Sequence, residues 1–239
     1  MIIDDAKLLL GGYDISSDAN KVMVNGGFAQ EPNSRFGDRT EVFANGVRRT
    51  GVMAEGFYRA ALDAVLRAKF DAGGALMSVF AVAATVGDAG DAIRINAGEY
   101  APLPDAAWGK ALAFAFRGYA LGARYSARYL ASGTKTVSGA GAALFIPGGV
   151  PTGKKLYGGL HVLGVSGIGA TLDATVTSDA AADFATPTTR VTHAQQSALG
   201  DSLPAGVAGP ITDEYFRFEW ALGGVNPSIP LFAWLAIQR

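Results

Sequence analysis

DEYFRFEWAL, residues 213–222, alternates aromatic and polar side chains between positions 215 and 220. Successive side chains on a β-strand point to opposite faces of the sheet. The aromatic residues therefore share one face and the polar residues share the other: Phe216, Phe218 and Trp220 against Tyr215, Arg217 and Glu219. We expect the aromatic face to lie in the core of a small β-sandwich. A carbohydrate-binding platform is the alternative for these aromatics.

Short apolar segments recur along the whole chain, separated by Gly, Asn, Asp or Pro. This rhythm is typical of an antiparallel β protein. In the first part of the chain, the predicted strands span residues 6–10, 21–24, 51–57, 75–85, 89–97, 110–117 and 142–146. In the second part they span residues 159–167, 169–179, 188–197, 213–222 and 229–238.

One segment, GFYRAALDAVLRAKFDAGG at residues 56–74, has apolar residues at helical spacing, beginning with Phe57. Asp63 and Arg67 lie four positions apart, as in a helical ion pair, and Gly73-Gly74 supplies a stop. The segment predicts one amphipathic helix near residues 57–71, flanking the β structure.

The composition changes near residue 130. Residues 1–130 contain 14 of the 20 Lys and Arg and 14 of the 21 Asp and Glu, whereas the remainder is richer in small residues. ASGTKTVSGAGAA, residues 131–143, has the composition of a linker. We therefore predict an antiparallel β-sandwich domain with one flanking helix over residues 1–130, a boundary at 131–144, and a second small β-sandwich over 145–239.

Composition also limits the classes of function. The net charge of −1 gives no bulk attraction to nucleic acid or to an anionic membrane. There is no cysteine and there are two histidines, so no metal site and no cofactor is expected. The acidic N-terminus does not resemble an export signal, and the longest apolar run, about residues 75–86, is too short to span a bilayer. We expect a soluble protein without membrane contact.

FIPGGVPTGKKLYGG, residues 145–159, matches seven positions of the phosphate-binding pattern G-x-x-x-x-G-K. The eighth position is Lys155, where a Ser or Thr hydroxyl is needed to coordinate magnesium. Residues 156–163 read as a turn and a strand, while a phosphate loop must open a helix. The better interpretation is a Gly/Pro-rich connector; a nucleotide-binding loop is the alternative.

No catalytic residue is predicted. Acidic pairs such as Asp4-Asp5 and Asp213-Glu214 adjoin turn residues, and turns are their ordinary place. A serine hydrolase would need His161 or His193 beside a G-x-S-x-G elbow, and Gly164-Val165-Ser166-Gly167 falls one residue short of it. His161 alternates with Leu160 and Val162, which predicts that it faces solvent.

Several loose motifs point to a family. They are Gly12-Tyr13-Asp14, Phe36-Gly37-Asp38, Gly46-Val47 leading into Gly56-Phe57-Tyr58, and later Arg117-Gly118 after a strand pair. In this order the chain resembles the major tail (tail tube) proteins of long-tailed bacteriophages. Its second half is similar to the C-terminal β module of related phage virion proteins.

The resemblance implies a structural virion protein and no enzyme. Members of the family form stacked rings, hexameric or trimeric with two similar domains, through which DNA passes without specific binding. Such a protein assembles in the host cytoplasm, joins other phage tail or head proteins, and ends in the virion. The alternative is a capsid decoration (cement) protein that forms trimers on the phage head.

The resemblance also implies contact loops and a lumen. We expect residues 28–46 and 96–110 to be extended loops that reach neighbouring subunits, although the charges of the first loop fit a solvated loop equally well. The predicted interface residues are Arg35, Phe36, Asp38, Arg39, Glu41, Tyr100 and Trp108. A negative lumen lets DNA slide, and its predicted residues are Asp88, Asp91 and Glu99.

Overall fold

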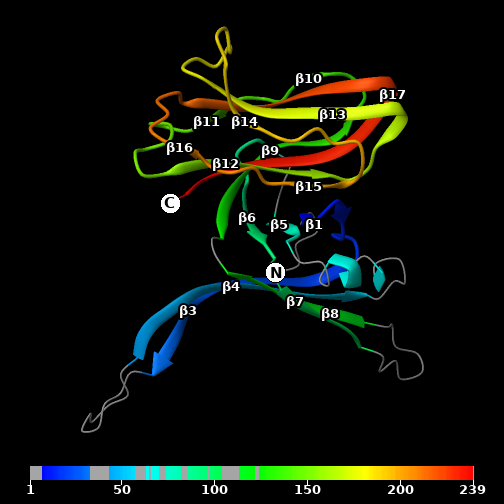
Figure 1. Ribbon diagram of the computed structural model, residues 1–239, viewed down its shortest axis with the longest axis vertical. Helices are drawn as coiled ribbons and strands as arrows, with labels where there is room; N and C mark the ends of the chain where they lie inside the picture. The colour runs from blue at the N-terminus through cyan, green and yellow to red at the C-terminus, as the bar shows by residue number, and fades with distance from the viewer. Residues whose placement is uncertain are drawn as a thin grey trace. The chain divides into compact units, whose positions relative to one another are not determined.

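The computed structural model describes residues 7–32, 43–57, 63–64, 66–69, 74–81, 85–95, 97–103, 113–121 and 124–238. The chain is mainly β, and its paired strands are antiparallel, as the sequence predicts (Figure 1). Contacts divide it into two compact units. The first unit contains residues 1–16, 76–92 and 125–239, and the second contains residues 17–75 and 93–124.

The larger sheet has 13 strands, with the order β14-β13-β17-β9-β6-β5-β1-β2 along its main path. Its other strands pair outside this path: β10, β11 and β12 with β17, and β15 and β16 with β12. The strands are β1 (Lys7–Leu10), β2 (Tyr13–Asp14), β5 (Leu76–Phe80), β6 (Ala89–Arg94), β9 (Tyr125–Lys135), β10 (Gly139–Ala140), β11 (Leu144–Phe145), β12 (Lys155–Val162), β13 (Ser166–Asp179), β14 (Thr188–Thr192), β15 (Gly200–Ser202), β16 (Val207–Ala208) and β17 (Tyr215–Gln238).

The long strand β17 corrects the prediction of two strands separated by a turn. Its first half pairs with β13, and its second half, from Ile229, pairs with β9 and β12. Gly224 and Asn226 have positive φ values of 88° and 51° between the two halves. Their Gly/Asn/Pro-rich surroundings resemble a turn in sequence, but here they bend one strand that passes from one set of partners to another.

Among the described residues, two apolar clusters lie in the first unit. The larger one includes Phe216 and Phe218, both 0% exposed, so the predicted core face is confirmed and the carbohydrate platform is wrong for these two rings. Trp220 is partly buried and packs against the same cluster. The second cluster forms around Phe80, Phe232 and Trp234.

The sheet topology does not show a separate second sandwich domain, because β9 and β17 share one sheet with β5 and β1. The boundary at 131–144 stays a prediction.

The second unit contains a four-stranded sheet in the order β3-β4-β8-β7. Its strands are β3 (Ala19–Pro32), β4 (Phe43–Phe57), β7 (Ala97–Leu103) and β8 (Ala113–Leu121). The expected loops at 28–46 and 96–110 are therefore partly wrong, because residues 28–32 and 43–46 lie in β3 and β4 and residues 97–103 form β7. Sequence reasoning missed these strand segments because Gly, Pro and charged residues interrupt their apolar pattern.

The predicted helix is present over residues 63–64 and 66–69. Arg67 Nε donates to Asp63 Oδ2 over 3.0 Å, and Leu66 is fully buried. Phe57, however, is the last residue of β4 and pairs with Ala113, so it belongs to the sheet and not to the helix. No helix among the described residues is long and apolar enough to cross a membrane.

Candidate functional site

A chain of hydrogen bonds joins four groups in the core of the first unit. His161 Nδ1 lies 2.6 Å from the Gly11 carbonyl oxygen, and its Nε2 lies 2.8 Å from Ser78 Oγ. Trp234 Nε1 donates to the same hydroxyl over 2.9 Å. His161 is 0% exposed, so the prediction that it faces solvent is wrong. Both faces of β12 are covered at this point, which removes the solvent side that the alternation implied.

The acceptors determine the direction of these bonds. A carbonyl oxygen only accepts, so His161 Nδ1 carries the proton and Nε2 accepts from the Ser78 hydroxyl. Burial lowers the pKa of His161, although the Gly11 carbonyl and Asp201 oppose that effect. The imidazole is therefore neutral near pH 7, with both nitrogens satisfied. Ser78 and His161 have the spacing of a nucleophile and its base, but both are fully buried, so no substrate reaches them.

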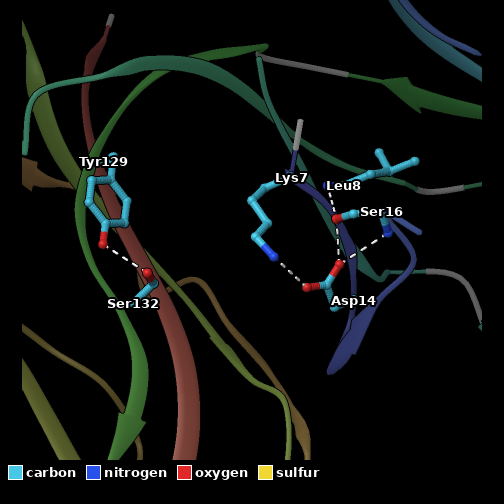
Figure 2. A network of polar contacts seen from close by, with 6 residues as sticks. All are labelled: Lys7, Leu8, Asp14, Ser16, Tyr129 and Ser132. Atoms are coloured by element: carbon cyan, nitrogen blue, oxygen red, sulfur yellow. Dashed lines mark hydrogen bonds and ion pairs between the residues drawn. The ribbon is translucent and has the colours of Figure 1, made fainter. Parts of the chain in front are cut away.

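A second polar network lies around the start of the chain (Figure 2). Lys7 Nζ forms an ion pair with Asp14 Oδ2 at 3.0 Å, and Ser16 donates to the other carboxylate oxygen from its backbone N–H. The pKa of Asp14 is lowered: burial raises it, but the Ser16 and Lys7 hydrogen bonds outweigh burial. Lys7 and Asp14 line a cavity of about 170 Å³ together with Ser132 and Phe232. This geometry ties β1 to β2.

A shallow groove of about 330 Å³ lies beside β9 and the end of β17. Most of its lining residues are apolar, and one of them, Phe145, is 50% exposed and packs against Tyr215. Arg128 is its charged lining residue, and Nη1 of this arginine donates to the Gly87 carbonyl. In the part of the chain that the structure describes, no group of three or more metal-ligating side chains is present.

The glycine-rich segment near residue 150 is a connector, as predicted. Gly148 and Gly153 lie in turns, and strand β12 begins at Lys155 where a phosphate loop would open a helix. Glu214 Oε1 accepts from the Gly148 N–H over 2.6 Å. A carboxylate thus takes the donor that a phosphate would need, and its charge repels an anion. The nucleotide-binding alternative is therefore wrong.

The predicted lumen residues fall in both units. Asp88 accepts from the Thr85 N–H over 2.8 Å, and Asp91 pairs with Ser126 in the first unit. Glu99 belongs to the second unit, where the backbone register places it opposite Arg117. Their role in a lumen stays a prediction.

Of the predicted interface residues, Tyr100 lies on β7, opposite Phe116 of β8. The others lie outside the described residues: Arg35, Phe36, Asp38, Arg39, Glu41 and Trp108. Their role at an interface also stays a prediction.

Sequence reasoning missed Ser78, Asp201 and Ser202 as partners of the two histidines. Asp201 Oδ2 accepts from the Leu76 N–H over 3.0 Å, and Ser202 Oγ lies 3.0 Å from His193 Nδ1. The pairs are 125 and 9 residues apart, and no local motif marks them. The burial of His161 could have been predicted from residues 156–165, because this run without Asp, Glu, Lys or Arg is typical of a strand buried on both faces.

Comparisons with known proteins give distant likenesses only. No protein-family model and no curated protein matches the chain. Among solved structures, it is similar to the SPP1 Dit (gp 19.1) protein, described as a paradigm of the hub adsorption apparatus in phages infecting Gram-positive bacteria (10% identity, TM-score 0.29, 98% of this chain and 99% of that chain). It is also similar to a chain of the phage P2 baseplate (7% identity, TM-score 0.32, 95% of this chain and 97% of that chain). A third similar structure is infectious bursal disease virus VP2 (13% identity, TM-score 0.33, 97% of this chain and 55% of that chain).

Proposed function

We propose that this chain is a structural protein of a phage tail, without catalytic activity, that assembles with copies of itself. The observation that supports it best is the four-stranded sheet of the second unit, whose edges are β3 and β7. Strand β3 has 14 residues, far more than the usual five or six, and no strand that the structure describes pairs with its outer side. Such an edge is suited to pairing with a strand of another subunit.

The finer proposal is a tail tube. The two edges of the sheet differ, because β7 has 7 residues and contains Pro102, which lacks an N–H donor. A contact between β3 of one copy and β7 of the next is heterologous, and heterologous contacts close into rings when the rotation permits. In this proposal the rings stack into a tube that lets DNA pass, and they join other tail proteins in the virion.

Electron microscopy of the purified full chain across a concentration series tests the proposal. Hollow tubes with a regular axial repeat are expected. Single rings that never stack would reject the tail tube. They would remain consistent with a structural protein located at the tip of the tail. Trimers or monomers at every concentration would favour the capsid decoration protein.

A charge introduced on β3 tests pairing through this edge strand, and the same substitution in the first unit is its control. Met23 lies on β3 and is 40% exposed, and Met23→Lys places a charge where natural sheets block edge pairing. We expect this variant to stay folded by circular dichroism and to lose rings and tubes. Val225→Lys changes an exposed apolar residue of the first unit, 58% exposed, and should assemble normally. Equal assembly of both variants would contradict pairing through β3.

A further inference from the structure

A segment of the first unit, residues 194–210, crosses the outer edge of β12; we call it the strap. It leaves β14, contributes β15 and β16, and ends before β17. β15 pairs with Leu160–Val162 and β16 pairs with Lys155 and Leu156. The side chains of the strap are exposed or half-buried. It thus covers an edge strand, and two of its partly buried apolar residues, Leu203 and Val207, pack against the core clusters.

Besides its strand pairing with β12, the strap forms a backbone bridge from Gln196 to Leu172 of β13 and several further contacts. Ser202 Oγ and His193 Nδ1 are 3.0 Å apart, and Asp201 Oδ2 accepts from the Leu76 N–H over 3.0 Å. The Gly209 N–H donates to the Lys154 carbonyl over 2.9 Å. Among these, the Ser202 contact joins the strap to an ionisable side chain that is itself buried.

His193 is held in an environment that does not tolerate a charge. It is 3% exposed, and its Nε2 has no hydrogen-bond partner among the described residues. The ring packs near Phe218 of β17, at 6.4 Å between centroids, and an added Cβ at Gly158 of β12 would lie 3.5 Å from Nε2. The backbone N–H of His193 donates to the Ala174 carbonyl of β13, and the ring Nδ1 lies 3.0 Å from Ser202 Oγ of β15. Burial lowers the pKa of His193 to about 4.

The other buried histidine provides the contrast. His161 has partners on both nitrogens, from β5 and from the Gly11 carbonyl, and it faces the carboxylate of Asp201 from β15. The described part of the chain brings no charged side chain into contact with His193. Of the two buried histidines, His193 is therefore the one whose ring is held by fewer hydrogen bonds.

We infer that His193 is an acid-sensitive latch, whose protonation releases the strap and uncovers the edge of β12. A protonated imidazole carries N–H groups on both nitrogens, and the buried Nε2 has no acceptor for its proton among the described residues. Opening of the strap gives this charge access to water. The freed backbone of residues 155–162 then forms an open edge that fits an incoming β-strand from another chain.

Hydrogen exchange of the full chain at pH 7.5 and pH 5.0, corrected for the intrinsic rates, tests the latch. The pKa of His193 is about 4 when the strap is closed and about 6.5 when it is open. The population of molecules with an open strap should therefore rise roughly 25-fold from pH 7.5 to pH 5.0. The rise should appear in the strap and β12 and not in β9, which is the internal reference. A uniform rise across the first unit, or none, would overturn the inference.

Two variants separate the latch from general loosening. His193→Gln cannot titrate and should lose the difference between the two pH values. Gln195→Ala removes contacts of 3.1 and 3.0 Å to Asp173 beside the latch, so it should open the strap more at both pH values while keeping their ratio. A ratio that persists in His193→Gln would reject the assignment.

A titration of wild-type protein by NMR gives an answer even when His193→Gln does not fold. The chain has two histidines, so their ring signals are few enough to assign. We expect the native pKa of His193 well below its ordinary value. An ordinary or raised value would overturn the latch.

Discussion

Among single residues, buried polar groups determine how the core of the first unit is arranged. Ser78 lies between Trp234 and His161 and satisfies a donor on one and an acceptor on the other. Buried polar groups without partners are costly, so a hydroxyl that serves both rings stabilises more than its size indicates. The network fixes the ring orientation of both large side chains.

Ser78→Ala tests this role. The substitution leaves the Trp234 N–H and the His161 Nε2 unpaired in a site that is 0% exposed. We expect a loss of roughly 2–4 kcal/mol in the free energy of unfolding, measured by urea denaturation. Ser132→Ala removes the 2.8 Å contact with Tyr129 in a partly buried site and should cost about 1 kcal/mol or less. Equal losses would contradict the special role of Ser78.

Between strands and loops, close backbone packing decides where the strap docks. Gly12, in the turn between β1 and β2, approaches both the strap and β12. An added Cβ there would lie 2.4 Å from the Gly200 nitrogen and 2.7 Å from the Val162 carbonyl oxygen. These are backbone atoms, so relief requires a shift of the strap or of β12.

We therefore expect Gly12→Ala to loosen the strap at neutral pH. The overlap should cost about 1–3 kcal/mol and raise hydrogen exchange over residues 194–210. Gly164→Ala is the control, because its added Cβ would meet Pro230 Cγ at an ordinary 3.5 Å. Protection of the strap that is unchanged in Gly12→Ala would show that the strap docks independently of this turn.

For the protein as a whole, two buried neutral histidines create sensitivity to acid. The pKa of His161 and that of His193 both lie below their ordinary value in the folded state. The unfolded chain therefore binds protons first as the pH falls, and stability that is present above about pH 6.5 is lost toward the folded values. Asp14 and Asp213 have lowered pKa values, so their contribution is lost only at lower pH, below about 4.

Thermal unfolding between pH 7.5 and pH 4 measures this effect. We expect the midpoint to fall steadily below pH 6.5, with His193 alone accounting for roughly 3 kcal/mol by pH 4. His193→Gln should start with lower stability and show a shallower fall. A midpoint independent of pH across this range would contradict buried neutral histidines.

Features that depend on local pattern can be predicted from the amino-acid sequence of this protein. The alternation at residues 215–220 predicted the core face, the Asp63–Arg67 spacing predicted the helical ion pair, and Lys155 with its neighbouring turn argued against a phosphate loop. Each of these predictions depends on contacts within a few residues or on side-chain periodicity, and both can be read from the sequence before the tertiary structure is known.

Features that depend on distant partners emerge only when the chain has folded. Burial of His161 requires Ser78 and Gly11, 83 and 150 residues away, and no local pattern marks that meeting. The continuity of β17 results from neighbours on both sides of a Gly/Asn bend that reads as a turn in isolation. The proposed latch at His193 likewise depends on the return of the strap to cover β12, where strand pairing at long range overrides local propensity.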